Sequence, residues 1–218
     1  TNVESSELIK YASNGFLATK ISFINEIAKM SEALGADVET VARGMGLDKR
    51  IGPMFLHPGP GVGGSCFPKD ARAVAQIARD QGTRFEIMES VLEVNEQTKK
   101  RMVEKIGQAF GEMRGKTVAV LGLSFKPDTD DIRESPALEI IEALLAQGAK
   151  VRAFDPAAMD ECRPLWDEVQ FCDTAYEAAQ DADGLVILTE WNQFRALDLG
   201  RLHGLLARPL IVDLRNIY

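Results

Sequence analysis

Histidine and cysteine are scarce in this chain, and no stretch is hydrophobic enough to cross a membrane. The two histidines, His57 and His203, lie far apart, which argues against a zinc site. Three cysteines without a close pair, and no visible secretory signal, favour a reducing compartment over a disulfide framework, so we expect a cytoplasmic protein without a membrane partner. The net charge of −8 argues against a nucleic-acid partner.

The chain has 218 residues, of which 45% are hydrophobic, and this is enough for one large or two small domains with buried cores. It begins TNVESSELIK, in the middle of a helical pattern and without a methionine. We therefore expect the sequence to be part of a longer protein.

A stretch rich in glycine and proline, Leu56–Asp70, is the most informative part of the sequence. It reads LHPGPGVGGSCFPKD, and Cys66 comes just before a helix expected over Pro68–Asp80. The positive end of the helix dipole and the charge of Lys69 would both lower the pKa of this thiol. Asp70, in the first turn, is placed to orient a water molecule or take a proton. The alternative is a glycine turn with an inert buried thiol and an aspartate that only favours the helix dipole.

A long helix is expected over residues 1–34, opened by Thr1 with Glu4 as a capping box. At 1.5 Å per residue it would be roughly 50 Å long. Two apolar rows step along it by three or four residues. They comprise Ile9, Ala12, Phe16, Phe23, Ile27, Met30 and Leu34, and Leu17, Ile21, Ile24 and Ala28. This apolar surface is wider than one small domain buries, so we expect a homodimer through helix 1–34.

Lys10 and Asn14 continue the second apolar row towards the amino terminus, four residues apart on one helical face. A polar pair in this position indicates either the wall of a partly buried pocket or a solvated helix end. The pattern by itself leaves both open.

From Lys116 onwards strands and helices alternate, which predicts a parallel sheet with helices on both faces. Before it, Phe85–Gly111 is expected to be helical, with Lys99 on a solvated basic face. Ligands of parallel sheets bind beyond the carboxyl ends of the strands. There the first turn, GLSFKPDTDDIRES, contains Gly122 as its only glycine, so it is not expected to hold NAD in the ordinary manner.

Three segments resemble the UDP-glucose 6-dehydrogenase branch of the UDP-glucose/GDP-mannose dehydrogenase family, NAD-dependent enzymes that oxidise a nucleotide sugar twice to a uronate. They are GPGVGGSCFPKD, ELIKYASNGFLA and the GLSFKPDTDDIRES turn. The resemblance implies an α/β chain with a helical central domain over 1–113 and a Rossmann-like UDP-sugar-binding domain over 114–218. It also implies that the family's amino-terminal NAD domain is absent.

The resemblance implies a role for each matching residue. Cys66 would be the nucleophile that forms a thiohemiacetal and then a thioester, Lys10 and Asn14 would stabilise the oxyanion, and Asp70 would position water. Lys69 and Arg133 would contact NAD. The implied substrate contacts are Arg50, Phe55, Leu56, Gly59, Gly61, Gly63, Gly64, Phe125, Lys126 and Arg215.

Other functions stay open at this point. Within the family, GDP-mannose and an N-acetylated UDP-sugar are alternative substrates, although the sequence GGSCFPKD favours UDP-glucose. A second alternative is that the chain is a stand-alone module for nucleotide-sugar binding and dimerisation. An unrelated thiol enzyme needs a base near Cys66, and His57 is the one histidine nearby.

Overall fold

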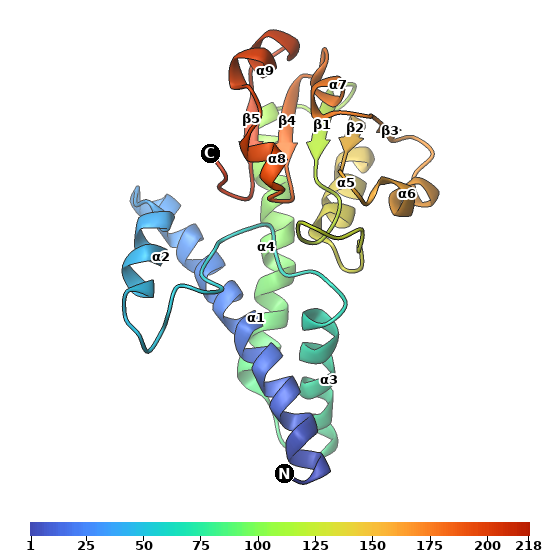
Figure 1. Ribbon diagram of the computed structural model, residues 1–218. Helices are drawn as coiled ribbons and strands as arrows, with labels where there is room; N and C mark the ends of the chain where they lie inside the picture. The colour runs from blue at the N-terminus through green and yellow to red at the C-terminus, as the bar shows by residue number, and fades with distance from the viewer. The chain divides into compact units, whose positions relative to one another are not determined.

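The structure is a computed structural model that describes all 218 residues (Figure 1). The chain divides into two compact units, Thr1–Thr98 and Lys99–Tyr218. The division falls within helix α4 (Glu86–Phe110), because its second half packs into the core of the sheet-containing unit through Met102, Ile106 and Phe110. The predicted border at 113/114 lies just beyond this helix, and as a border between functional domains it stays a prediction.

The first unit is helical and begins with the 32-residue helix α1 (Val3–Leu34). The predicted cap at Thr1 is wrong by one residue. Asn2 is the N-cap, because its side-chain oxygen accepts a hydrogen bond of 3.0 Å from the backbone N–H of Ser5. Gly35, with a φ of 69°, ends the helix in the left-handed conformation that glycine adopts without strain.

Three further helices complete this unit. They are α2 (Val38–Gly46), which Asp37 caps, α3 (Phe67–Asp80) and the first half of α4. Gly15 allows the closest approach of α1 to α4, since a Cβ there would lie 2.9 Å from the Cε of Met88. The core residues around this contact are Ala18, Ala71, Val74, Ala75, Met88 and Val91.

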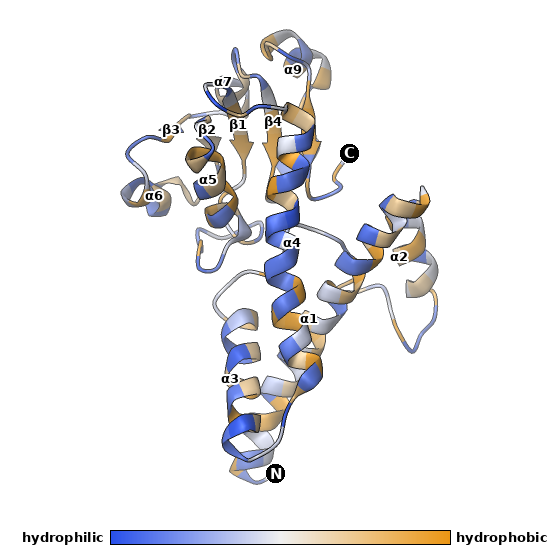
Figure 2. Cartoon of the chain, turned by 180° about the vertical axis from the view of Figure 1, so that it is seen from behind, coloured by the Kyte–Doolittle hydropathy of each residue, from blue (hydrophilic) through white to orange (hydrophobic).

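The two apolar rows of α1 differ in their environment. Phe16, Phe23 and Met30 of the first row are exposed, whereas Ile24 of the second row is fully buried with Ala42 and Leu56. Figure 2 shows the hydrophobic stretches along this helix. Only the first row therefore presents an apolar face to the surroundings.

The second unit is built on a five-stranded sheet in the order β3-β2-β1-β4-β5, with every neighbouring pair parallel. This confirms the predicted α/β architecture. Alternation along β1 sends Val118 and Val120 into one core and Ala119 and Leu121 into the other. The strands are β1 (Thr117–Leu121), β2 (Lys150–Phe154), β3 (Gln170–Phe171), β4 (Gly184–Ile187) and β5 (Ile211–Asp213).

Helices cover both faces of this sheet (Figure 1). On one face lie the second half of α4, α5 (Pro136–Ala146), α6 (Met159–Cys162) and the 3₁₀ turn η1 (Arg163–Leu165). On the other lie α7 (Ala175–Ala179), α8 (Asn192–Arg195) and α9 (Leu199–Leu205). The two-residue strand β3 and the four-residue helices α6 and α8 were not predicted, because elements this short show no hydrophobic period.

The prediction that Lys99 lies on a solvated face is wrong. Its side chain is buried and forms an ion pair with Glu139 of α5, so it joins α4 to α5 within the second unit. No helix of the chain combines the length and the apolarity that crossing a bilayer requires.

Candidate functional site

Cys66 lies at the N-cap position of α3 with its thiol exposed. The backbone N–H of Asp70 donates to the Cys66 carbonyl at 2.8 Å, which closes the first turn of the helix. The hydroxyl of Ser65 lies 3.7 Å from the sulfur. The thiol therefore faces the positive end of a 14-residue helix, as the position before Pro68 predicted.

Asp70 connects α3 to two residues of α1 that are far away in the sequence. The Asn14 amide donates to Asp70 Oδ2 at 2.7 Å, and Lys10 Nζ lies 3.5 Å from the same oxygen. Lys69 Nζ lies 3.9 Å from the other carboxylate oxygen. The structure thus brings Lys10, Asn14 and Asp70 into one cluster, one helical turn after Cys66.

This cluster combines a buried anion with accessible donors. The side chain of Asp70 is only 1% exposed, whereas the side chain of Lys10 is 61% exposed. An ammonium has three donor hydrogens and a side-chain amide has two, so Lys10 and Asn14 keep donor capacity beyond their contacts with Asp70. The arrangement can hold water through the carboxylate and oppose negative charge on a substrate oxygen.

The loop that leads to Cys66 begins on an apolar anchor. Leu56 is buried against Ile24 and Ala42, and the rings of Phe55 and Phe67 lie 6.1 Å apart between their centroids. Gly61 and Gly64 have φ values of 131° and 89°, which only glycine adopts without strain. The predicted roles of Phe55, Leu56, Gly59, Gly61, Gly63 and Gly64 as substrate contacts stay predictions.

Arg50 is the most exposed of the predicted substrate contacts in the first unit. Its side chain is 88% exposed and forms a two-pronged pair with Asp48, with Nε 3.0 Å from Oδ1 and Nη2 2.6 Å from Oδ2. Lys20 of α1 donates to the carbonyls of Ile51 and Gly52, which ties this loop to the long helix.

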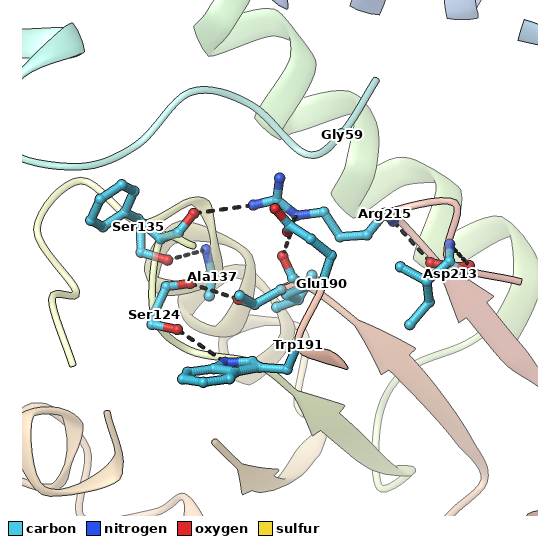
Figure 3. A network of polar contacts seen from close by, with 12 residues as sticks. Gly59, Ser124, Ser135, Ala137, Glu190, Trp191, Asp213 and Arg215 are labelled. Carbon is cyan, nitrogen blue, oxygen red and sulfur yellow. Dashed lines mark hydrogen bonds and ion pairs between the residues drawn. The ribbon is translucent and has the colours of Figure 1, made fainter. Parts of the chain in front are cut away.

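The three predicted substrate contacts of the second unit lie together beyond the carboxyl ends of the strands, and Figure 3 shows one of them, Arg215. Arg215 Nε donates to the carbonyl of Leu188 at 2.7 Å, and its Nη2 donates to the carbonyl of Phe125 at 3.4 Å. Lys126 Nζ lies 5.5 Å from the centre of the Phe125 ring. Glu190 Oε2 lies 3.1 Å from Arg215 Nε. Burial lowers the pKa of the Arg215 guanidinium, and the Glu190 and Asp213 carboxylates oppose this shift.

A buried polar network that the sequence did not reveal holds these loops in place. Asp155 Oδ2 accepts hydrogen bonds from Leu123 N, Ser124 N, the Ser124 hydroxyl and Trp191 Nε1, at 2.7 to 3.2 Å. Figure 3 shows the Trp191 indole pointing at Ser124. The sequence placed the segments of all these residues at the carboxyl edge, but no local signal distinguished Asp155 from a solvated aspartate.

The turn after β1 does not form an ordinary dinucleotide cradle. Gly122 has a φ of 96°, and a Cβ there would lie 2.5 Å from the backbone nitrogen of Thr189. Gly122 therefore packs closely against the segment after β4, and the turn has no second glycine to let its backbone approach a pyrophosphate. Arg133, the predicted NAD contact in the same segment, is 69% exposed at its side chain and pairs with Asp131, whose pKa it lowers through their hydrogen bond.

Two family models match the chain. The central domain of the UDP-glucose/GDP-mannose dehydrogenase family matches residues 4–97, and the UDP-binding domain of the same family matches residues 119–218. Together the two matches include Lys10, Asn14, Cys66 and Asp70 as well as the loops around Arg215.

Curated relatives align along the whole chain. The UDP-glucose 6-dehydrogenase of Rhizobium meliloti is 53% identical over 219 aligned residues, which cover 100% of this chain and 50% of the relative. A UDP-glucose 6-dehydrogenase of Bacillus subtilis is 48% identical, with 100% of this chain and 48% of the relative covered. The chain thus spans about half the length of the curated relatives it matches.

Solved structures agree with the sequence relatives. A UDP-glucose dehydrogenase from Pyrobaculum islandicum superposes with a TM-score of 0.89 at 41% identity, over 96% of this chain and 47% of that one. A UDP-D-ManNAc dehydrogenase from Pyrococcus horikoshii gives 0.87 at 27% identity, over 100% of this chain and 50% of that one. The matched domains, the identities and the shared fold lead to one conclusion, that the chain belongs to the UDP-glucose/GDP-mannose dehydrogenase family.

Proposed function

We propose that this chain is the nucleophile-bearing and UDP-sugar-binding part of an NAD-dependent UDP-glucose 6-dehydrogenase. One observation carries the proposal. Asp70 is buried one helical turn after Cys66, whose thiol is exposed, and Asp70 contacts both Lys10 and Asn14. Relatives that are 48% and 53% identical over the full chain and are named UDP-glucose 6-dehydrogenases support it.

In the proposed mechanism Cys66 is the covalent nucleophile. Its thiolate adds to the carbonyl carbon of the substrate at the aldehyde level, and the carbonyl electron pair moves to the oxygen. Lys10 and Asn14 donate to this oxygen and stabilise its negative charge, since an ammonium carries a positive charge and a side-chain amide is a hydrogen-bond donor. When the substrate is held as a thioester, Asp70 orients the water that attacks it, and Cys66 leaves as the thiolate.

Two hydrides separate a primary alcohol from a carboxylate, and NAD, when bound, would accept one of them, so two NAD molecules would be used in succession. The turn after β1 does not fit the NAD pyrophosphate, because Gly122 is its only glycine and the dinucleotide motif needs three. The proposal therefore assigns the main NAD site to a part of the enzyme outside these 218 residues. Lys69 and Arg133 are the residues of this chain proposed to contact the cofactor.

The diphosphate and uridine of the substrate are assigned to two sets of donors. Lys126 and Arg215 supply charge at the sheet edge, with Phe125 beside them, and Arg50 supplies charge from the first unit. The exposed side chain of Arg50 supports this assignment, because a contact with a mobile ligand requires an accessible guanidinium.

The proposed location is the cytoplasm, where a reducing environment keeps the Cys66 thiol free.

Titration calorimetry with the 218-residue chain tests the substrate assignment. We expect UDP-glucose and UDP to bind, and Lys126→Ala to weaken binding by roughly tenfold through the loss of a charge-assisted contact. Lys150→Ala, at the start of β2 on the opposite edge of the sheet, is the matched control and should bind normally. Absence of UDP-glucose binding by the unmodified chain would overturn the proposal.

The same titration, read together with the reactivity of Cys66, distinguishes two other functions. Tighter binding of GDP-mannose or an N-acetylated UDP-sugar would move the substrate within the family. Solved dehydrogenases named for such sugars are 27% and 28% identical to this chain, compared with 41% for the named UDP-glucose enzyme. Binding without any reactivity at Cys66 would favour a stand-alone nucleotide-sugar module.

A further inference from the structure

Two buried asparagines hold the backbone of the glycine-rich loop that precedes Cys66. Asn25 of α1 accepts a hydrogen bond from the Gly59 N–H at 2.8 Å. Asn95 of α4 accepts from the Val62 N–H at 2.6 Å and donates to the Val62 carbonyl at 3.2 Å. The two side chains are 7% and 9% exposed by residue, so their amides interact with the loop out of contact with bulk water.

Neither asparagine serves the helix in which it lies. Asparagine has a lower helix propensity than leucine or alanine, and a buried amide is unfavourable unless it is hydrogen-bonded. Both side chains form hydrogen bonds with backbone atoms of the loop, which lie 33 or 34 residues away in the sequence. The loop is therefore the reason for polar residues at these two buried positions.

The loop depends on such outside support. Residues 53–65 contain no helix or strand. Gly61 and Gly64 have positive φ values, and glycine can adopt many other backbone conformations as well. Leu56 fixes its start on Ile24, and Cys66 fixes its end at the N-cap of α3. Gly59 and Val62 lie between these ends, where Asn25 and Asn95 supply the hydrogen bonds that the loop lacks.

We propose that Asn25 and Asn95 are positioning residues, which hold the Gly59–Gly64 backbone in the one conformation that lets a nucleotide-sugar approach Cys66. The inference rests on the proposed function and adds residues that act through the loop without touching the substrate. Asn25 acts through an acceptor alone, whereas Asn95 acts through an acceptor and a donor. The two positions therefore respond differently to the same conservative substitution.

Hydrogen exchange followed by mass spectrometry on the 218-residue chain measures the clamp directly. Asn25→Ala should speed exchange of the peptide containing Gly59, and Asn95→Ala that containing Val62, each by about tenfold. Asn25→Asp keeps the acceptor and should restore slow exchange. Asn95→Asp loses the donor to the Val62 carbonyl and should not. Asn192→Ala, exposed at the start of α8, is the matched control.

Two readouts separate positioning from simple structural support. The alanine variants should change the alkylation rate of Cys66 and weaken UDP-glucose binding, each by roughly tenfold, and Asn25→Asp should restore both. Exchange in the sheet-containing unit serves as the check that the variants fold. Unchanged exchange at Gly59 and Val62 would overturn the clamp. Faster exchange with normal Cys66 alkylation and normal UDP-glucose binding would overturn its positioning role.

The proposed function fails separately. If the unmodified chain binds no UDP-glucose, that function is overturned. In that case the clamp is judged by exchange and Cys66 alkylation alone, where a tenfold change restored by Asn25→Asp supports it and no change overturns it.

Discussion

At the scale of single residues, the three cysteines have different chemical environments. Cys66 is exposed at a helix N-terminus, whereas Cys162 and Cys172 are buried. Burial raises the pKa of the Cys162 thiol to about 12, with smaller contributions from the Asp155 and Glu161 carboxylates. Burial also raises the pKa of Cys172. A folded chain therefore offers one thiol suited to nucleophilic chemistry.

Selective alkylation tests this difference. At pH 8 a thiol with a pKa near 12 is ionised to only about one part in ten thousand, so iodoacetamide should label Cys66 at least about a hundredfold faster than Cys162. It should also label Cys66 faster than Cys172, because Cys172 is buried and burial raises its pKa. Peptide mass spectrometry measures the three rates, and labelling in urea, where all three thiols are exposed, is the control. Equal rates in the folded chain would contradict an accessible, activated Cys66.

At the scale of secondary-structure elements, α1 is the support for the first unit's functional segments. Lys10 and Asn14 contact Asp70 of α3, Lys20 holds the loop after Arg50, and Asn25 holds Gly59. A single straight element thus sets the spacing of three segments that are separate in the sequence. Its other face carries an apolar groove that none of these contacts uses, lined by Phe23, Glu26, Ile27, Lys29, Met30 and Ala33.

We propose that a second copy of the chain covers this groove and forms a homodimer. A charged residue introduced into the groove tests this proposal. Met30 is 56% exposed, so Met30→Glu should leave the fold intact and yield monomers in sedimentation at micromolar concentration. Ile87→Glu, at a position 61% exposed at the start of α4, is the matched control and should remain dimeric. A monomeric unmodified chain would contradict the prediction. Ile24→Glu is unsuitable, because Ile24 is fully buried and its substitution would disrupt the core.

The loops of the second unit depend in a similar way on Asp155, which follows β2. Besides its four contacts through Oδ2, its Oδ1 accepts from the backbone N–H groups of Ala157 and Ala158 at 2.8 and 2.9 Å. One fully buried carboxylate therefore fixes the turns after β1, β2 and β4.

Asp155→Ala should destabilise this unit by about 3 kcal/mol or more, since it leaves several buried donors without an acceptor. Urea unfolding followed by tryptophan fluorescence measures the effect, because both tryptophans, Trp166 and Trp191, lie in this unit. Asp160→Ala, at a side chain 93% exposed, should change the free energy of unfolding by less than about 0.5 kcal/mol. Equal effects of the two substitutions would show that the Asp155 network contributes no specific stability.

At the scale of the whole molecule, the chain carries the central domain and the UDP-binding domain of its family. We expect it to bind without turnover. UDP and UDP-glucose should give calorimetric heats through Lys126 and Arg215, whereas NAD should not bind strongly, because the turn after β1 has Gly122 as its only glycine. An absorbance assay with UDP-glucose and NAD should then show no NADH. Production of NADH by this chain would mean that the cofactor site is misplaced in the proposal.

The local features of the fold were predictable from the sequence. The helix start after Cys66 and the parallel strands both follow from patterns among residues close together in the chain. The cap of α1 was misplaced by one residue, because Thr1 and Asn2 are both good capping residues and neighbouring candidates compete.

The resemblance of the motifs singled out Lys10, Asn14, Cys66 and Asp70, and helical spacing placed the first two on one face. Their shared contact was not predictable, because 56 residues separate Asn14 from Asp70. The same holds for Asn25, Asn95, Asp155 and Trp191, whose sequence neighbours carry no sign of their partners. Helix, strand and turn preferences depend on adjacent residues, so the sequence by itself determined the elements. The choice of partner for a buried polar group depends on which distant segments pack around it, and only the tertiary structure decided that.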